Sequence, residues 1–315
     1  MPANVCLIVN PSAGGGKAGR VAPAVLRRLQ ELGLETRRVD TRDLEHAREL
    51  ATAAADAKEI VACLSGDGLI GVIADVLRAH PDAVLGVLPG GRGNDLARVL
   101  GIAEDAVEAC TTIAAGVVRS VDLGLVGDVD DPERAFVGIA SCGFDSDANR
   151  IANEAPPWLG GLVYAYGALR ALLSWRPARF EVVAHPSGQV HVFHGYSVAA
   201  ANSRAYGGGM LIAPHALLDD GQLDLILTST AGKLRFLANL PRVFKGTHVE
   251  LPSVHSFKAP EVTISADRPF TLYADGDPIG ELPVRVRAER AAVKMLVPAG
   301  ESTAAFDSAP PPRLI

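Results

Sequence analysis

The chain has 315 residues, of which 48% are hydrophobic and only 5% aromatic, and its formal net charge at pH 7 is −6. This length favours two domains over a single small one. The acidic balance excludes nucleic acid as the main partner, because neutralising its backbone phosphates needs a basic surface, but it leaves open a nucleotide ligand or brief membrane contact through a local basic patch.

The first third of the chain alternates predicted strands and helices. The apolar run at 5–9 is typical of a strand buried on both faces, and residues 19–32 place Val21, Val25 and Leu29 on one helical face. Further strands are expected at 35–39, 59–64 and 84–88, and further helices at 43–55, 69–79, 95–100 and 107–115. This alternation predicts a doubly wound, mostly parallel α/β domain over residues 1–121, with ligands beyond the carboxyl ends of its strands.

From about Val121 the pattern changes to short alternating runs separated by turns. Strands are expected at 136–140, 180–183, 190–193, 196–201, 223–227, 262–266, 270–273, 284–286 and 293–297, and helices at 162–173 and 233–244. The pattern is typical of an antiparallel β-sandwich or barrel. We predict a β-rich domain over residues 122–288, followed by a segment at about 289–315 that returns to the first domain.

Three glycine-rich turns in the first domain, Asn10–Lys17, Ser65–Gly68 and Pro89–Asp95, each follow a predicted strand and open a predicted helix. Glycine lets the backbone approach a phosphate, and helix N-termini offer unpaired N–H groups to it. The turns also contain Asp67 and Asp95, and a phosphate site needs such carboxylates only when a metal accompanies the phosphates. The combination predicts a nucleotide bound as its magnesium complex.

Two other interpretations compete at these turns. The segment Gly14–Gly19 also fits the dinucleotide fingerprint G-x-G-x-x-G, with Asp40 at the end of the next strand, which by itself favours a nicotinamide-dependent dehydrogenase. The later turns argue against that enzyme, and a Walker A motif is excluded because Lys17 is followed by Ala18. Capping of the following helix is an equally good explanation for Asp95.

The three turns together resemble the diacylglycerol kinase catalytic family, which includes bacterial diacylglycerol kinases and the sphingosine and ceramide kinases. The family patterns N-P-x-x-G-x-G, G-G-D-G-T-x-x-E and P-x-G-T-G-N-D-x-A-R correspond to Asn10–Gly16, Ser65–Val72 and Pro89–Arg98. Later in the chain, Tyr206–Asp224 resembles the family's segment around a structural metal, and Tyr273–Asp277 resembles its acidic catalytic turn.

The resemblance implies a fold like that of NAD kinase and phosphofructokinase, with the active site in the cleft between an α/β domain and a β-sandwich domain. It implies a lipid kinase that uses ATP and Mg²⁺ and phosphorylates a hydroxyl of diacylglycerol or a related lipid. The residues expected to bind ATP are Asn10, Pro11, Gly14, Gly15, Gly16, Lys17, Thr41, Ser65, Gly66, Asp67, Gly68, Gly91, Arg92, Gly93, Asn94 and Asp95.

The resemblance also assigns acidic residues to catalysis and to metal binding. Asp277 is the expected base for the attacking hydroxyl, and Asp275 is the alternative base or a second metal ligand. Asp67, with Asp95, is expected to hold magnesium. A second cation away from the chemistry would be held by Asp220 with the carbonyls of Leu217 and Gln222, although an ordinary Asp-Gly turn explains that segment equally well.

Departures from the family pattern leave alternatives open. Val72 stands where the family has glutamate, and Asp75, on a neighbouring face of the same helix, is considered as its substitute. Arg92 replaces a threonine, where its guanidinium would either pair with a phosphate or crowd the nucleotide. The alternatives are a catalytically degenerate nucleotide- or lipid-binding regulator, an NAD kinase, or an NAD-dependent enzyme.

Localisation and partners follow from what the chain lacks. Four widely spaced cysteines without a CxxC pair predict reduced core residues of a cytosolic protein. Met1 leads directly into the first strand, so no signal peptide is expected, and the longest apolar stretch, 159–169, is shorter than the roughly 20 residues of a membrane-spanning helix. We expect a cytoplasmic protein with transient peripheral contact at the inner face of the membrane and a lipid substrate, and a homodimer stays open.

Overall fold

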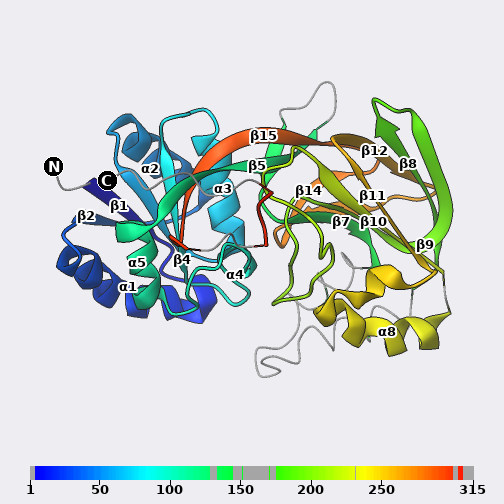
Figure 1. Cartoon of the computed structure of the whole chain (residues 1–315), viewed down its shortest axis with the longest axis horizontal. Helices are drawn as coiled ribbons and strands as arrows, with labels where there is room; N and C mark the ends of the chain where they lie inside the picture. Colours follow the sequence, from blue (N-terminus) through cyan, green and yellow to red (C-terminus); the bar gives the residue numbers. More distant parts are fainter. Residues whose placement is uncertain are drawn as a thin grey trace.

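The computed structural model describes residues 4–127, 133–144, 151, 170, 175–230, 232–300 and 304–307. An α/β half and a β-rich half lie side by side, with two long strands running along both of them (Figure 1). The predicted helix at 162–173 lies outside the described residues, except for residue 170. Within the described residues, no helix is long and apolar enough to cross a membrane.

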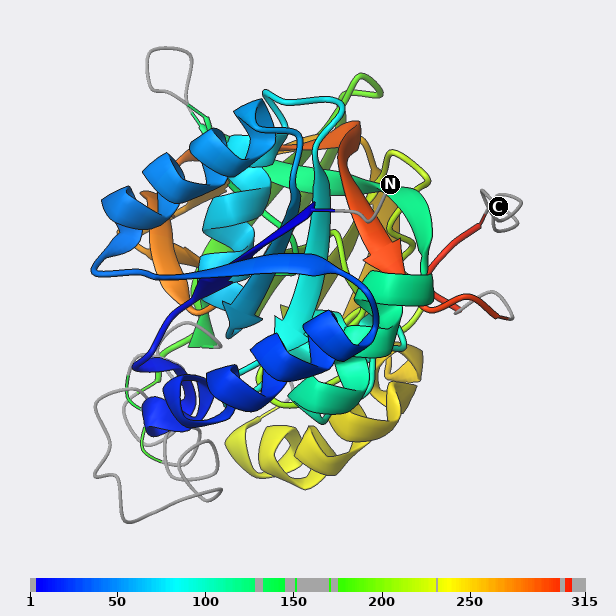
Figure 2. The ribbon, with the colours of Figure 1, turned by 90° about the vertical axis from the view of Figure 1, so that its left-hand side faces the viewer.

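The N-terminal half contains a parallel sheet in the order β4-β3-β1-β2. The continuous apolar runs of β1, β3 and β4 bury almost every residue of these strands, as expected for a sheet covered on both faces. Helices α1 and α5 cover one face, and α2 and α3 cover the other (Figure 2). The elements are β1 (Asn4–Val9), α1 (Ala13–Glu31), β2 (Glu35–Asp40), α2 (Leu44–Asp56), β3 (Ile60–Ser65), α3 (Asp67–Leu77), β4 (Val84–Pro89), α4 (Asp95–Val99) and α5 (Ala106–Ala115).

The C-terminal half is antiparallel, as predicted, and forms a sandwich-like β domain. Its central strand is β9, which pairs with β7, β8 and β10. Its core is apolar and includes Phe136, Phe180, Val198, Leu225 and Ile264. The elements are β6 (Arg134–Phe136), β7 (Ile139–Gly143), β8 (Ala178–His185), β9 (Gln189–Ala201), β10 (Leu223–Ser229), α8 (Lys233–Lys245), η2 (Thr247–Glu250), β11 (Val254–Ala259), β12 (Glu261–Ala266), β13 (Thr271–Ala274) and β14 (Asp277–Glu281).

Two long strands, β5 (Val117–Gly127) and β15 (Val284–Val297), connect the halves. The first residues of β15 pair with β12, whereas Lys294 and Met295 pair in parallel with β4. The chain therefore returns to the N-terminal sheet near its end. The predicted division between residues 121 and 122 falls inside β5, which pairs with β15 from Val117 to Gly127.

The four cysteines, Cys6, Cys63, Cys110 and Cys142, are buried, and none of them forms a disulfide. Burial raises the pKa of Cys6 to about 11 and raises that of Cys63 further. The Cys6 and Cys63 thiols therefore stay protonated at neutral pH, and all four cysteines are buried, as predicted for core residues.

Candidate active site

The three glycine-rich turns meet at the carboxyl ends of β1, β3 and β4. A Cβ atom added to Gly14 would lie 2.5 Å from the carbonyl oxygen of Gly90, and one added to Gly91 would lie 2.5 Å from the Cα of Gly66. The N–H of Gly90 donates to the carbonyl of Ser65 over 2.8 Å. Only glycine permits backbone segments to pack this closely, so the glycines of all three turns serve one shared structure.

The first turn owes its shape to consecutive glycines. Gly14, Gly15 and Gly16 have φ angles of +60°, +67° and +84°, so the regular right-handed part of α1 begins after them. The Asn10 side chain accepts hydrogen bonds from the N–H and the hydroxyl of Ser12, over 3.2 and 2.8 Å. Thr41 continues from β2 and donates its N–H to the carbonyl of Val9 over 2.8 Å. The predicted nucleotide-binding residues of β1 and β2 thus lie at one edge of the sheet.

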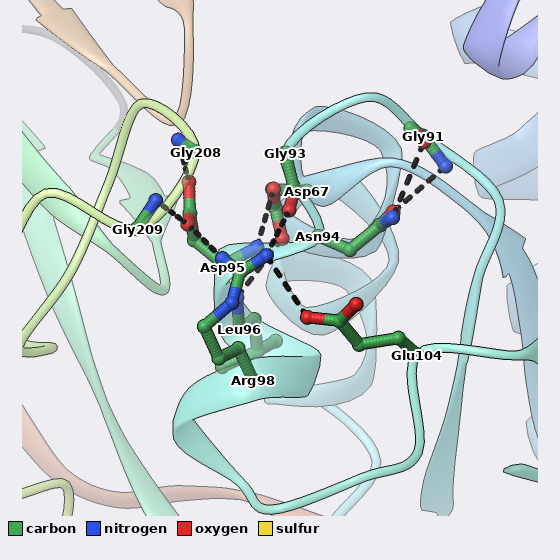
Figure 3. A network of polar contacts seen from close by, with 10 residues as sticks. All are labelled: Asp67, Gly91, Gly93, Asn94, Asp95, Leu96, Arg98, Glu104, Gly208 and Gly209. Atoms are coloured by element: carbon green, nitrogen blue, oxygen red, sulfur yellow. Dashed lines mark hydrogen bonds and ion pairs between the residues drawn. The ribbon is translucent and has the colours of Figure 1, made fainter.

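Asp67 joins the second turn to the third. It is the first residue of α3, but its carboxylate accepts the backbone N–H groups of Asp95 and Leu96 over 3.1 Å each (Figure 3). Asp67 therefore caps α4, whose first N–H groups have no partner within the helix. The capping role considered for Asp95 is wrong, because its carboxylate bonds to Gly208, Gly209 and Arg98 instead. The side chain of Asn94, at the N-cap position, makes no cap hydrogen bond either. Burial raises the pKa of the Asp67 carboxyl.

Asp95 instead connects the third turn to the C-terminal half. Its side chain is buried, and its two oxygens accept the N–H groups of Gly208 and Gly209 over 2.8 and 2.7 Å (Figure 3). Arg98 donates to the same carboxylate over 2.6 Å. Gly208 and Gly209 have φ angles of +84° and +98°, a conformation that turns both N–H groups toward Asp95 and that other residues rarely adopt. We call Asp95, Arg98, Gly208 and Gly209 the Asp95 clasp.

Asp275 is enclosed between the two halves. Its oxygens accept the N–H groups of Val137 and Gly138 over 2.8 and 2.9 Å. A Cβ atom added to Gly138 would lie 2.3 Å from one of these oxygens, and one added to Gly71 would lie 3.1 Å from the other. Burial raises the pKa of Asp275 to about 7, the charge of Asp67 acts in the same direction, and the backbone hydrogen bonds oppose the rise.

Asp277 begins β14 and is exposed, yet it faces the N-terminus of α3. A Cβ atom added to Gly68 would lie 3.0 Å from its Oδ2 atom and 3.6 Å from the carbonyl oxygen of Asp275. Partial desolvation raises the pKa of Asp277, while the positive charge of Arg134 opposes the rise. The structure thus brings Asp67, Asp275 and Asp277 together around the start of α3, although the last two belong to the C-terminal half.

The acidic residues allow one simple magnesium arrangement. The contacts of the Asp67 carboxylate are with uncharged backbone N–H groups, whereas the Asp95 carboxylate also pairs with the positive charge of the Arg98 guanidinium. In the parts of the chain that the structure describes, no group of three His, Cys, Asp or Glu side chains could hold a metal. Because Mg²⁺ usually binds one or two carboxylates and completes its shell with phosphates and water, Asp67 fits as its main protein ligand.

The predicted second cation site does not fit its residues. The Lys258 ammonium lies 2.7 Å from one oxygen of Asp220 and 3.3 Å from Asp224. The other Asp220 oxygen accepts the N–H of Gln222 over 3.0 Å, within the turn that follows Leu217. A divalent cation at Asp220 would be repelled by the positive charge of Lys258. The Lys258 side chain therefore neutralises the carboxylates of this loop in place of a metal ion. Lys258 was not identified as the counter-ion from the sequence, because it lies 38 residues after Asp220 in the chain.

Two departures from the family pattern now have a place in the structure. Asp75 pairs with Arg78 of its own helix over 3.0 Å and with Arg48 of α2 over 3.3 Å. It therefore does not replace the glutamate missing at Val72. Arg92 is exposed on the third turn, where its guanidinium remains accessible to a bound nucleotide.

Comparisons with known proteins agree with this arrangement. The family model described as the diacylglycerol kinase catalytic domain matches residues 4–126, and the YegS C-terminal NAD kinase beta sandwich-like domain matches residues 138–297. A diacylglycerol kinase of Mycobacterium tuberculosis is 35% identical over 298 residues, which cover 93% of this chain and 95% of that protein. A diacylglycerol kinase of Bacillus subtilis is 28% identical over 284 residues, covering 88% and 90%. The crystal structure of a diacylglycerol kinase from Bacillus anthracis superposes with a TM-score of 0.71 at 18% identity, covering 94% and 97%, and it supports the fold alone.

Proposed function

Because the chain belongs to the diacylglycerol kinase catalytic-domain family, we propose that it is an ATP-dependent lipid kinase that phosphorylates a hydroxyl of diacylglycerol or a related lipid. The relatives are diacylglycerol and lipid kinases, and the acceptor lipid of this chain is inferred from them. We also propose the domain division given above: residues 1–121 with 289–315 for the nucleotide, and residues 122–288 for the lipid.

The nucleotide would lie against the three glycine turns. The N-termini of α1 and α3 lie there and offer N–H groups to a phosphate, whereas the first N–H groups of α4 are already accepted by Asp67. Magnesium, held by Asp67, would neutralise charge on the β- and γ-phosphates. The Asp95 clasp would keep the third turn in place against the segment from the other half.

Asp277 is the proposed base. The lipid hydroxyl oxygen attacks the γ-phosphorus, the bond from that phosphorus to the β–γ bridging oxygen breaks, and ADP leaves. The hydroxyl proton passes to the Asp277 carboxylate. A carboxylate with a raised pKa is a better proton acceptor near neutral pH, and Asp277 is the more exposed of the two aspartates in this turn. Asp275, enclosed by backbone N–H groups, acts as a positioning residue for this turn.

One observation carries this assignment: the Asp277 carboxylate lies against Gly68, next to the residue proposed to hold magnesium. The proposed base, which belongs to the C-terminal half, therefore lies beside the glycine turns at which the phosphates would bind. The cytoplasm supplies ATP and the membrane supplies the lipid, so we infer a cytoplasmic enzyme that works at the inner face of the membrane.

The test is incubation with labelled ATP, magnesium and a bacterial lipid extract, followed by identification of the lipid that gains phosphate. Wild-type protein should label diacylglycerol or a close relative, and Asp277→Asn should not. Asp267→Asn, at an exposed position of another turn in the same domain, serves as the control and should retain activity. Nucleotide binding without transfer to any lipid would favour the degenerate regulator, and phosphorylation of NAD would favour an NAD kinase.

A further inference from the structure

Helix α8 carries an unusual concentration of exposed apolar surface. None of its residues is buried, and Leu234, Phe244 and Leu237 are 87%, 56% and 37% exposed. Large exposed side chains of this kind are costly in water when they gather on one element, and such patches usually mark an interaction site. These exposed residues have no part in the active site described above.

The exposed apolar residues form one stripe along the helix. Leu234, Leu237, Pro241 and Phe244 follow the spacing i, i+3, i+7, i+10, which confines them to a sector of about 80° on a helix of 3.6 residues per turn. The opposite side is anchored to the domain: Phe236 stacks on Tyr196 with ring centroids 4.3 Å apart and contacts Phe144 edge-on at 4.7 Å. The stripe is therefore held outward by packing of the other face.

The charge of α8 is opposite to that of the whole chain. The helix contains Lys233, Arg235, Arg242 and Lys245 and no acidic residue, whereas the chain as a whole has a net charge of −6. On a helical projection, Arg235, Arg242 and Lys245 flank the apolar stripe along one side. An apolar stripe bordered by basic residues is the pattern of a helix that lies in the interface of an anionic membrane.

Helix α8 also lies on the side of the molecule where contact with a membrane would bring a lipid substrate near the active site. In Figure 2 the arrows of the N-terminal sheet point toward the side on which α8 lies, which is the side of the glycine turns. The carbonyl of Val243 in α8 accepts the N–H of Leu211 over 3.0 Å. Leu211 follows the segment whose Gly208 and Gly209 hold Asp95, so the helix is connected directly to the Asp95 clasp.

We propose that α8 docks this protein onto an anionic lipid bilayer. Leu234, Leu237 and Phe244 enter the boundary between headgroups and acyl chains, and the basic residues meet the lipid phosphates. The proposal rests on the proposed function in one respect, because that function gives the bilayer its role as the source of the acceptor.

The test is co-sedimentation of the full chain with phosphatidylcholine vesicles that contain about one third phosphatidylglycerol, compared with phosphatidylcholine alone. Wild-type protein should bind the anionic vesicles, more weakly as salt rises. The double variant Leu234→Gln/Phe244→Gln should bind roughly tenfold more weakly, and Arg235→Gln/Arg242→Gln should lose the preference for anionic lipid. Val190→Gln/Val192→Gln changes exposed apolar residues of β9 and should bind as wild type does within about twofold.

Melting temperatures serve as the folding control. They should stay close to that of the wild type, because the replaced side chains are exposed. Unchanged vesicle binding by the Leu234→Gln/Phe244→Gln variant, or no binding by the wild type, would overturn the proposal, and so would docking of α8 on a protein partner in preference to vesicles. Phosphoryl transfer is measured in the same vesicles. Binding without transfer would contradict the proposed function and leave the docking surface intact.

Discussion

Replacement of Asp95 by asparagine tests whether the clasp holds the nucleotide turn against the C-terminal half. Asp95 is 6% exposed, and its carboxylate accepts hydrogen bonds from Gly208, Gly209 and Arg98 over 2.6–2.8 Å. Asparagine keeps one of the two oxygens and directs an NH₂ group at a backbone N–H. The change is nearly isosteric, so the loss of acceptors is its main effect.

The expected cost is several kcal/mol. Hydrogen bonds to a charged group contribute about 1.5–3 kcal/mol each, and at least one would be replaced by two opposed donors. Arg98 is 40% exposed and keeps Glu104 as a second partner, so its charge adds little, and the predicted loss is about 2–4 kcal/mol in the free energy of unfolding. For a protein of this size each kcal/mol lowers the melting temperature by about 2 °C, so a decrease of about 4–8 °C is expected.

Thermal unfolding and the KM for ATP are the measurements. The third turn loses its anchor in Asp95→Asn, so the KM should rise together with the loss of stability. Glu104→Gln is the matched control: Glu104 contacts the same Arg98 over 3.4 Å but is 79% exposed, so its loss should change stability by no more than about 0.5 kcal/mol. A melting temperature of Asp95→Asn within 1–2 °C of wild type, on the order expected for the control, would refute the reasoning.

Four further predictions concern the proposed catalytic turn, its contact with Gly68 and the Lys258 loop. Asp277→Asn should lower kcat about 10²–10⁴-fold with little change in melting temperature, because the side chain is exposed; turnover close to that of wild type would exclude it as the base. Since a base must be ionised and the pKa of Asp277 is raised, kcat/KM should fall with decreasing pH already above the ordinary carboxyl value of about 4; a flat profile down to that pH would contradict this role. Gly68→Ala should improve helix propensity yet reduce kcat roughly tenfold by displacing Asp277. Gly71→Ala, on the same helix, presses on Asp275 instead. Equal activity of Gly68→Ala and wild type would show that the contact between Gly68 and Asp277 is unimportant. Lys258→Ala should lower the melting temperature and make it rise with added Mg²⁺ more steeply than in the wild type, because two carboxylates lose their counter-charge; a magnesium response no larger than that of the wild type would contradict this.

Local sequence was sufficient to predict the fold class and the family. Apolar runs and turn residues alternate at the spacing of parallel β/α units in the first third of the chain and at that of antiparallel strands afterwards, and both halves of this prediction are confirmed. The glycine turns were recognisable because close backbone packing leaves no other residue type at positions such as Gly14 and Gly91. The resemblance to diacylglycerol kinases, which rests on these turns, is confirmed by the comparisons.

The sequence by itself thus determined the strands and helices of the first domain, their order and the turns that meet at the sheet edge, because these depend on periodicity and on backbone conformation within a few residues. In the second domain it missed β5, β11 and β14 and divided the continuous strands β9 and β15 into two each. Only the tertiary structure decided which group each acidic side chain serves. Asp67 caps a helix 28 residues away, Asp95 accepts N–H groups 113 residues away, and Asp220 takes a lysine 38 residues further on as its counter-ion. A carboxylate has the same local pattern whether it caps a helix, joins two domains or binds a metal, because its partners come from other parts of the fold.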